Sequence, residues 1–130
     1  MAYAIEIILN RQLADCLAIP VFITDTAGNL LFYNEPAEEI LGKRYEETGE
    51  MAVEEWSTVF KNKDVNGEPL PPVELPLVKT LKNQLPYFKT FCIESLQGKA
   101  EKISVTSYPI IGRAGGFLGA VAIFWRSSEE

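Results

Sequence analysis

Thiols and carboxylates are the side chains of this sequence that could carry chemistry. Cys16 and Cys92 stand far apart, and their placement matches no metal-ligand motif. The chain has no histidine, which excludes histidine-ligated haem and removes the commonest general base. The adjacent carboxylates Glu38-Glu39 and Glu54-Glu55 fall on predicted helix surfaces, where charges are normally solvated. Because no nucleophile–base pair is readable, we predict no catalytic residue, no metal site and no enzymatic activity.

The composition is that of one globular domain. The 130 residues are 47% hydrophobic and 23% charged, with a formal net charge of −6. An acidic surface argues against a nucleic-acid or anionic-membrane partner. No apolar run is long enough for membrane insertion, and the N-terminus lacks the pattern of a signal peptide. Two cysteines without a disulfide framework indicate reduced thiols, so we expect a cytoplasmic protein.

The first element that could position a site is an amphipathic helix. Its apolar residues recur at helical spacing and are Ile5, Ile8, Leu9, Leu13, Cys16 and Leu17. The helix must end before Pro20. Tyr3 and Ile7 form a second small patch, which either frays at the chain end or meets a partner helix across a dimer. We assign residues 1–18 to a dimerisation or capping helix, 19–126 to the main domain, and 127–130 to a tail or linker.

A hairpin and a capped helix follow. Residues 21–24 and 30–33 are two short strands. Asp25 and Gly28 suit the first and last positions of a tight turn between them. Asn34 comes directly after the second strand, and its side chain is expected to cap the next helix.

The second half of the chain is predicted to end in a sheet. A loop over residues 62–72 leads into a helix that has Pro76 in its first turn. Three strands rich in β-formers then occupy residues 87–94, 101–108 and 117–125. Since helices and strands come in blocks and do not alternate, the sequence predicts an α+β fold with an antiparallel sheet.

Three motifs in this order resemble the PAS domain family. The first is Asp25-x-x-Gly28-x-Leu30-x-x-x-Asn34. The second is Asn-Gly-Glu-Pro-Leu-Pro-Pro at residues 66–72 with Leu-Pro-Leu at 75–77, similar to a bacterial and archaeal sensory subgroup. The third is Tyr108-Pro109-Ile110 followed by Gly119-Ala120-Val121. The resemblance covers about Leu17 to Trp125 and implies the PAS fold, a five-stranded antiparallel sheet with helices on one face.

A PAS fold implies a ligand position between the sheet and its helices. Strand parity predicts that Phe117, Gly119, Val121 and Ile123 face this interior. The ligand-pocket candidates are Trp56, Phe60, Leu77, Val78, Leu81, Lys89, Phe91, Ile93, Val105, Phe117 and Val121. Lys89 either meets an anionic ligand at the rim or extends along the surface into water. The apolar candidates either line a pocket for an unknown small molecule or fill a packed core.

No cofactor is identified by the sequence. Flavin-binding relatives that form a cysteine adduct carry an Asn-Cys-Arg-Phe motif, and nothing here resembles it. Cys16 is predicted on the N-terminal helix and Cys92 inside a strand, where a thiol is normally inert. The residues therefore argue against an adduct-forming flavin.

The opposite sheet face is predicted to be too apolar to face water. Together with the N-terminal helix it supplies the dimer-interface candidates Tyr3, Ile5, Ile8, Leu9, Phe88, Tyr108 and Phe124. The helix covers this face either within one chain or across a symmetric homodimer. Both alternatives bury the helix stripe that contains Ile5, Leu9 and Leu13.

The resemblance implies a sensory module of signal transduction, as in two-component systems. A small ligand or a partner would shift the packing between the sheet and the N-terminal helix and so bias an effector. The family implies an effector such as a histidine kinase or a nucleotide cyclase. The alternative is a purely structural interaction and dimerisation module with a filled core and no small ligand.

Overall fold

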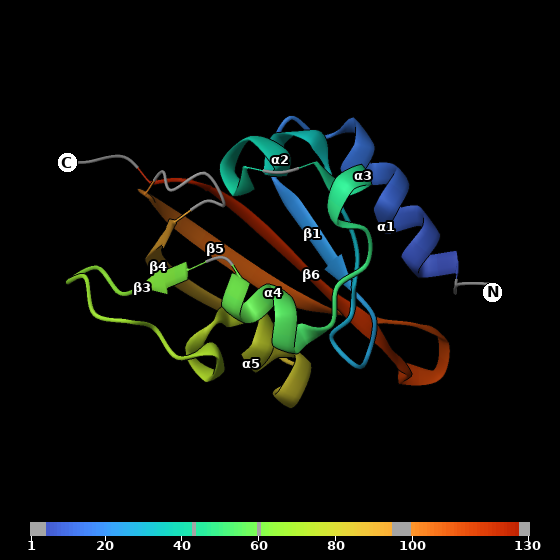
Figure 1. The fold of residues 1–130 in the computed structure, drawn as a ribbon. Helices are drawn as coiled ribbons and strands as arrows, with labels where there is room; N and C mark the ends of the chain where they lie inside the picture. Colours follow the sequence, from blue (N-terminus) through green and yellow to red (C-terminus); the bar gives the residue numbers. More distant parts are fainter. Residues whose placement is uncertain (1–4, 43, 60, 95–99, 128–130) are drawn as a thin grey trace.

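The computed structural model describes residues 5–42, 44–59, 61–94 and 100–127. In chain order (Figure 1), its elements are α1 (Ile5–Cys16), β1 (Val21–Thr24), β2 (Leu30–Tyr33), α2 (Glu35–Leu41), α3 (Tyr45–Thr48), α4 (Val53–Val59), β3 (Lys61–Lys63), η1 (Pro72–Glu74), α5 (Pro76–Asn83), β4 (Tyr87–Glu94), β5 (Ala100–Ile111), η2 (Arg113–Gly115) and β6 (Phe117–Arg126). None of the described helices combines the length and the apolar character that crossing a bilayer requires.

A single antiparallel sheet organises these elements, in the strand order β2-β1-β6-β5-β4-β3. The N-terminal strand β1 pairs with the C-terminal strand β6, which places Phe22 opposite Ala122. The predicted α+β class is therefore confirmed. The sheet has one strand more than the five expected, because β3 pairs with β4 through Asn62 opposite Ile93. A Lys-Asn-Lys segment has no strand pattern of its own, so this pairing depends on tertiary contacts.

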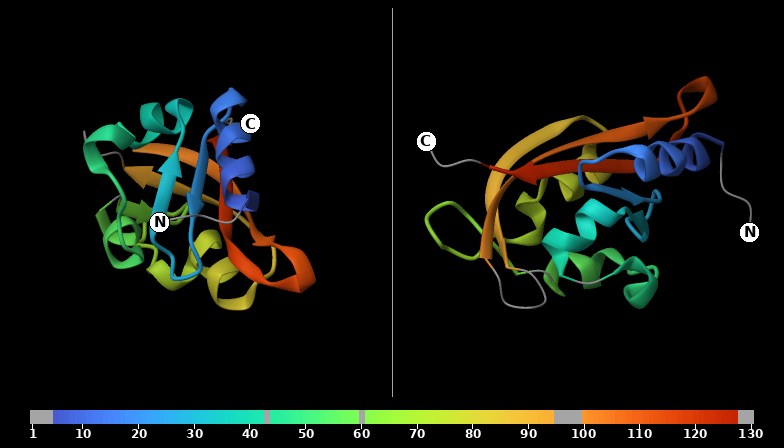
Figure 2. Two further views of the ribbon diagram at one scale, coloured as in Figure 1. Left: turned by 90° about the vertical axis from the view of Figure 1, so that its right-hand side faces the viewer. Right: turned by 90° about the horizontal axis from the view of Figure 1, so that it is seen from above.

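Helices cover both faces of the curved sheet (Figure 2). Helices α2 to α5 lie over the inner face, and α1 lies on the other side. Two apolar clusters result. The inner cluster includes Phe22, Trp56 and Phe91, whereas the cluster beneath α1 includes Ile7 and Ile23.

Helix α1 buries a different stripe from the predicted one. Ile7 and Ala14 contact the sheet and are 6% and 1% exposed, whereas Ile5, Leu9 and Leu13 are each more than half exposed. Ile7 and Ala14 are two helical turns apart, so they lie on one side of the helix. The small Ala14 side chain lets the helix approach the sheet closely. The prediction that Ile5, Leu9 and Leu13 are buried is wrong within one chain.

The predicted orientation of β6 is also wrong. Val121 faces the cluster beneath α1, and Phe124 faces the inner cluster, 5% exposed. The register pairs Phe124 with Val105 and Val121 with Tyr108, which fixes the side of each residue. Because both faces of β6 are covered, its sequence does not alternate between apolar and polar residues, and parity could not be read from it.

The turn and cap predicted in the first motif are confirmed. The Asp25 carboxylate accepts hydrogen bonds from the backbone N–H groups of Ala27 (3.0 Å) and Asn29 (2.9 Å). The buried Asn34 side chain accepts from Ala37 N at 3.3 Å and caps α2. It also accepts from Val21 N at 3.0 Å.

Candidate functional site

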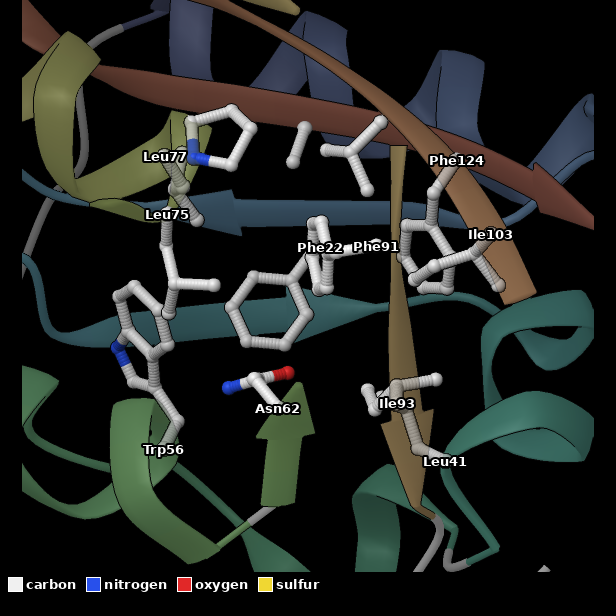
Figure 3. A pocket seen from close by; sticks show the side chains of 13 residues that line it. Phe22, Leu41, Trp56, Asn62, Leu75, Leu77, Phe91, Ile93, Ile103 and Phe124 are labelled. Carbon is white, nitrogen blue, oxygen red and sulfur yellow. The ribbon is translucent and has the colours of Figure 1, made fainter. Parts of the chain in front are cut away.

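A small cavity lies between the inner face of the sheet and the helices that cover it (Figure 3). Its volume is about 70 Å³. The strands β1, β3, β4, β5 and β6 contribute the sheet side of the cavity, and α2, α4 and the residues at the start of α5 cover it. The lining residues are Phe22, Leu41, Trp56, Asn62, Leu75, Pro76, Leu77, Phe91, Ile93, Ile103, Val105, Ala122 and Phe124. All are apolar apart from Asn62 and the single indole N–H of Trp56.

The aromatic wall of the cavity is held by a hydrogen bond to the first turn. Trp56 Nε1 donates to the backbone oxygen of Gly28 at 2.7 Å, in a buried position. Phe22 packs edge-on against Trp56, with ring centroids 5.3 Å apart, and stacks on Tyr33 at 5.9 Å. Gly28 has φ +89°, and a Cβ there would lie 3.0 Å from Val53 Cβ. The turn therefore needs glycine, and its carbonyl group orients the tryptophan.

Among the described residues, Asn62 is the one polar side chain at the cavity with unused hydrogen-bonding capacity. Its backbone oxygen accepts from Leu70 N at 2.9 Å, and the register with Ile93 turns its side chain to the inner face. No hydrogen bond to the side-chain amide occurs among the described residues. In Figure 3 the amide lies at the cavity, near Trp56, Phe22 and Ile93.

Five of the predicted pocket residues line the cavity: Trp56, Leu77, Phe91, Ile93 and Val105. Val78 and Leu81 pack against the inner cluster, half-buried, without lining the cavity. Lys89 and Phe117 are half-buried and also lie outside the lining. Val121 is on the opposite face of the sheet. Phe60 lies outside the described residues.

The sequence interpretation missed several lining residues. Ile103 shares the strand parity of Val105 and was left out of the candidates only by selection. Ala122 and Phe124 follow from the correct strand register, and Phe22 from the burial of β1 on both faces. The remaining ones are Leu41, Asn62, Leu75 and Pro76. Leu75 and Pro76 lie inside the Leu-Pro-Leu motif, so that motif carried a signal. Asn62 carried none, because its placement depends on a strand that the sequence does not predict.

The residues at the cavity do not fit an adduct-forming flavin. Cys92 lies on β4 opposite Lys102, on the outer face of the sheet, and Cys16 ends α1. Neither cysteine lines the cavity. Pockets that enclose drug-sized ligands usually measure about 300–1,000 Å³, so the cavity of this conformation is also too small for a flavin or a haem. No cluster of metal-ligating side chains is present among the described residues.

The outer surface carries most of the predicted interface residues. Ile5 and Phe88 are 65% and 62% exposed, and Leu9 is more than half exposed. Ile8 lines a groove of about 270 Å³ between α1 and β2, where the Arg11 guanidinium lies 4.4 Å from the centre of the Phe32 ring. Phe124 is buried against the inner cluster. Tyr3 lies outside the described residues.

Aromatic side chains extend this surface across the sheet. Phe88 and the exposed Trp125 lie with ring centroids 6.3 Å apart. Tyr108 is half-buried, and burial raises the pKa of its hydroxyl group.

At the sheet end, the hydrogen bond from Arg126 to Glu101 raises the pKa of the guanidinium.

The chain is similar to known proteins in both sequence and fold. A family model described as "PAS domain" matches residues 9–74, just over half of the 130-residue chain. Among curated proteins, no match to the sequence is found.

Solved structures share the fold at low sequence identity. The LOV protein of Rhodobacter sphaeroides is 12% identical with a TM-score of 0.73, over 96% of this chain and 69% of that chain. The PAS domain of nitrogen regulation protein NR(II) from Vibrio parahaemolyticus is 13% identical with a TM-score of 0.63, over 92% and 98%. The PAS domain of BvgS from Bordetella pertussis is 16% identical with a TM-score of 0.63, over 97% and 89%.

Proposed function

Because the chain belongs to the PAS domain family, we propose that it is a sensory module of signal transduction that binds a small ligand or a partner, dimerises and regulates an effector. The PAS fold expected from the three motifs is confirmed by the similarity to solved structures. The observation that carries the proposal is the apolar cavity between the sheet and its helices, which offers a ligand a place among mostly buried apolar side chains. The nitrogen regulation protein NR(II), one of the structures with this fold, is regulatory by its name.

The ligand part of the proposal predicts a molecule that copurifies with the protein. Protein purified under native conditions would be denatured, and the extract analysed by mass spectrometry against an extract of Phe22→Trp. The larger ring fills the cavity, since Phe22 lines it and contacts Trp56. A stoichiometric molecule that is present in the native extract and absent from the variant supports sensing. Equal extracts contradict it.

The dimer part rests on the uncovered apolar surface of α1 and the outer sheet. Leu9 is 55% exposed on α1, so Leu9→Lys disturbs this surface without touching the core. We expect the mass measured by light scattering to shift towards the monomer. Val65→Lys is the matched control, because Val65 is 57% exposed in the loop after β3. An unchanged dimer in Leu9→Lys would show that α1 is not the interface.

The effector is proposed by analogy with the family, as a histidine kinase or a nucleotide cyclase domain joined to the module. We place the protein in the cytoplasm and assign it no catalytic role. The chain has no histidine, and its side chains at the cavity are apolar except for Asn62 and Trp56 Nε1. Neither group is a nucleophile paired with a base.

A second candidate function is a docking and dimerisation module that binds no small ligand. The size of the cavity favours this alternative, since 70 Å³ is small for a ligand site. In that case the Phe22→Trp variant would dimerise and regulate its effector as well as the parent protein does. A cavity variant that lost regulation while staying folded and dimeric would contradict the docking function.

A further inference from the structure

We propose that the cavity takes a small uncharged molecule, mostly apolar, that carries one hydrogen-bonding group, and that the Asn62 side chain binds this group. The inference rests on the proposed ligand-binding function and names the chemical class of the ligand. It follows from three properties of the cavity: the lack of charged side chains among its described lining residues, the polar Asn62 side chain, and the small volume.

The absence of charge on the walls selects an uncharged ligand. Among the residues that the structure describes, no Lys, Arg, Asp or Glu side chain lines the cavity. A carboxylate or an ammonium group that enters it loses its hydration and meets no opposite charge, which costs far more than an apolar contact returns. Lys89, the cation that sequence parity placed at the rim, is outside the lining.

Asn62 supplies one point of recognition. Trp56 Nε1 is already bonded to Gly28, so the Asn62 amide is the donor and acceptor of the wall that makes no hydrogen bond to another described residue. The backbone of Asn62 is bound on both sides, because β3 pairs with β4 opposite Ile93 and the Asn62 backbone oxygen accepts from Leu70 N. These contacts fix the position of the half-buried amide at the cavity wall. An amide oxygen and an NH₂ group together match a ligand amide, ketone or alcohol. Burying that group without a partner would be unfavourable, so Asn62 also orients the ligand.

The volume limits the ligand to a few non-hydrogen atoms. An engineered cavity of about 150 Å³ in another protein accepts benzene, and 70 Å³ is about half of that volume. A three-carbon amide is a reasonable probe of this size. The matching carboxylate differs from it chiefly in charge, and the matching ammonium carries the opposite charge and has no acceptor oxygen. We therefore choose propionamide, propionate and propylammonium, with benzamide as the oversized amide.

The two tryptophans make the test site-specific. Trp56 lines the cavity, whereas Trp125 is exposed on the outer face of the sheet beside Phe88. Each probe would be titrated into ¹⁵N-labelled protein, and the two indole N–H signals would be followed by NMR. We expect propionamide to shift the Trp56 signal saturably and to leave Trp125 in place. Propionate and propylammonium should bind at least about tenfold more weakly, a difference of about 1.4 kcal/mol. Benzamide should not bind.

The variant Asn62→Leu tests the hydrogen bond. It keeps the side-chain size and should weaken propionamide binding by about 3- to 10-fold, the range expected for one hydrogen bond. Asn66→Leu is the matched control in the exposed loop after β3 and should leave the affinity unchanged. Should Asn62→Leu not fold, as judged by the two indole signals, Asn62→Ala replaces it with the same expectation.

The outcomes separate this inference from the proposed function. If the charged probes or benzamide bind as well as propionamide, or if Asn62→Leu and Asn62→Ala bind it undiminished, the ligand class is refuted while the cavity remains a binding site. If no probe moves the Trp56 signal, the inference is refuted and the ligand part of the sensory function loses its support. The docking function would then remain.

Discussion

Removing the side chain of Asn34 should destabilise the protein more than most single substitutions. This amide joins three elements at one buried point, where it is 2% exposed. Its oxygen accepts from Val21 N and Ala37 N, and its Nδ2 donates to the backbone oxygens of Ala14 and Ile19, both at 2.9 Å. Asn34 thus connects the end of α1, the start of β1 and the start of α2.

The magnitude of the loss follows from these bonds. Loss of the α2 cap costs about 1 kcal/mol. Val21 N then lacks its acceptor in a buried place, which adds about 1–3 kcal/mol. Ala14 O keeps a bond from Leu17 N, so its share is small. We expect Asn34→Ala to lower the free energy of unfolding by about 3 kcal/mol and the midpoint of thermal unfolding by about 10 °C.

Urea denaturation measures this loss against Asn10→Ala. Among the described residues, the Asn10 side chain makes one bond, from its Nδ2 to Glu6 O on α1, and its removal should cost less than about 0.5 kcal/mol. Hydrogen exchange adds a local readout, because the amides of Val21 and Ala37 should lose protection in Asn34→Ala. A loss below about 1 kcal/mol, or unchanged protection of both amides, would refute the reasoning.

Two further predictions concern close contacts in the core. Gly119→Ala should lower the free energy of unfolding by more than about 3 kcal/mol in urea denaturation, since φ is +154° and the new Cβ would lie 2.2 Å from Thr24 O. The control is Gly67→Ala, which should cost only about 1 kcal/mol, because φ is +89° and nothing lies within 4 Å of the new Cβ. Equal losses at both sites would contradict this. Thr80 and Ser107 are fully buried with their hydroxyl oxygens 2.6 Å apart, so a double-mutant cycle of Thr80→Val and Ser107→Ala should give a coupling of about 1 kcal/mol. Strict additivity would rule out that bond.

The parts of the fold that the sequence predicts correctly have local causes. The turn at Asp25 and the cap at Asn34 depend on side-chain bonds to backbone groups only a few residues away. The strand β4 was also predicted with its observed bounds, because Phe, Ile and Thr dominate it. Such features need no knowledge of the rest of the chain.

The features that the sequence did not predict depend on contacts between distant segments. Ile7 is buried because it lies on the same side of α1 as the small Ala14, two turns along, and both face the sheet. The spacing of apolar residues alone does not predict which side of the helix faces the sheet. Val121 and Phe124 exchanged their expected faces because β6 is apolar on both sides. Asn62 enters the cavity through pairing with β4. These are the same contacts that build the site, which is why the sequence predicts the fold better than the ligand position.

The strand β1 explains how a change in the cavity would reach the helix on the other face of the sheet. Its four residues are all buried, and the first three alternate between the two apolar clusters, with Phe22 in the inner cluster and Val21 and Ile23 beneath α1. Phe22 lines the cavity, and its neighbour Val21 donates to Asn34, which holds Ala14 of α1. Because Phe22 and Val21 are consecutive residues of one strand, a displacement of Phe22 would also displace Val21. Phe22 contacts the cavity and the adjacent Val21 contacts Asn34, so two consecutive residues of β1 connect the cavity to α1. We infer that a signal between the cavity and the proposed dimer surface on α1 needs no longer chain of contacts through the sheet.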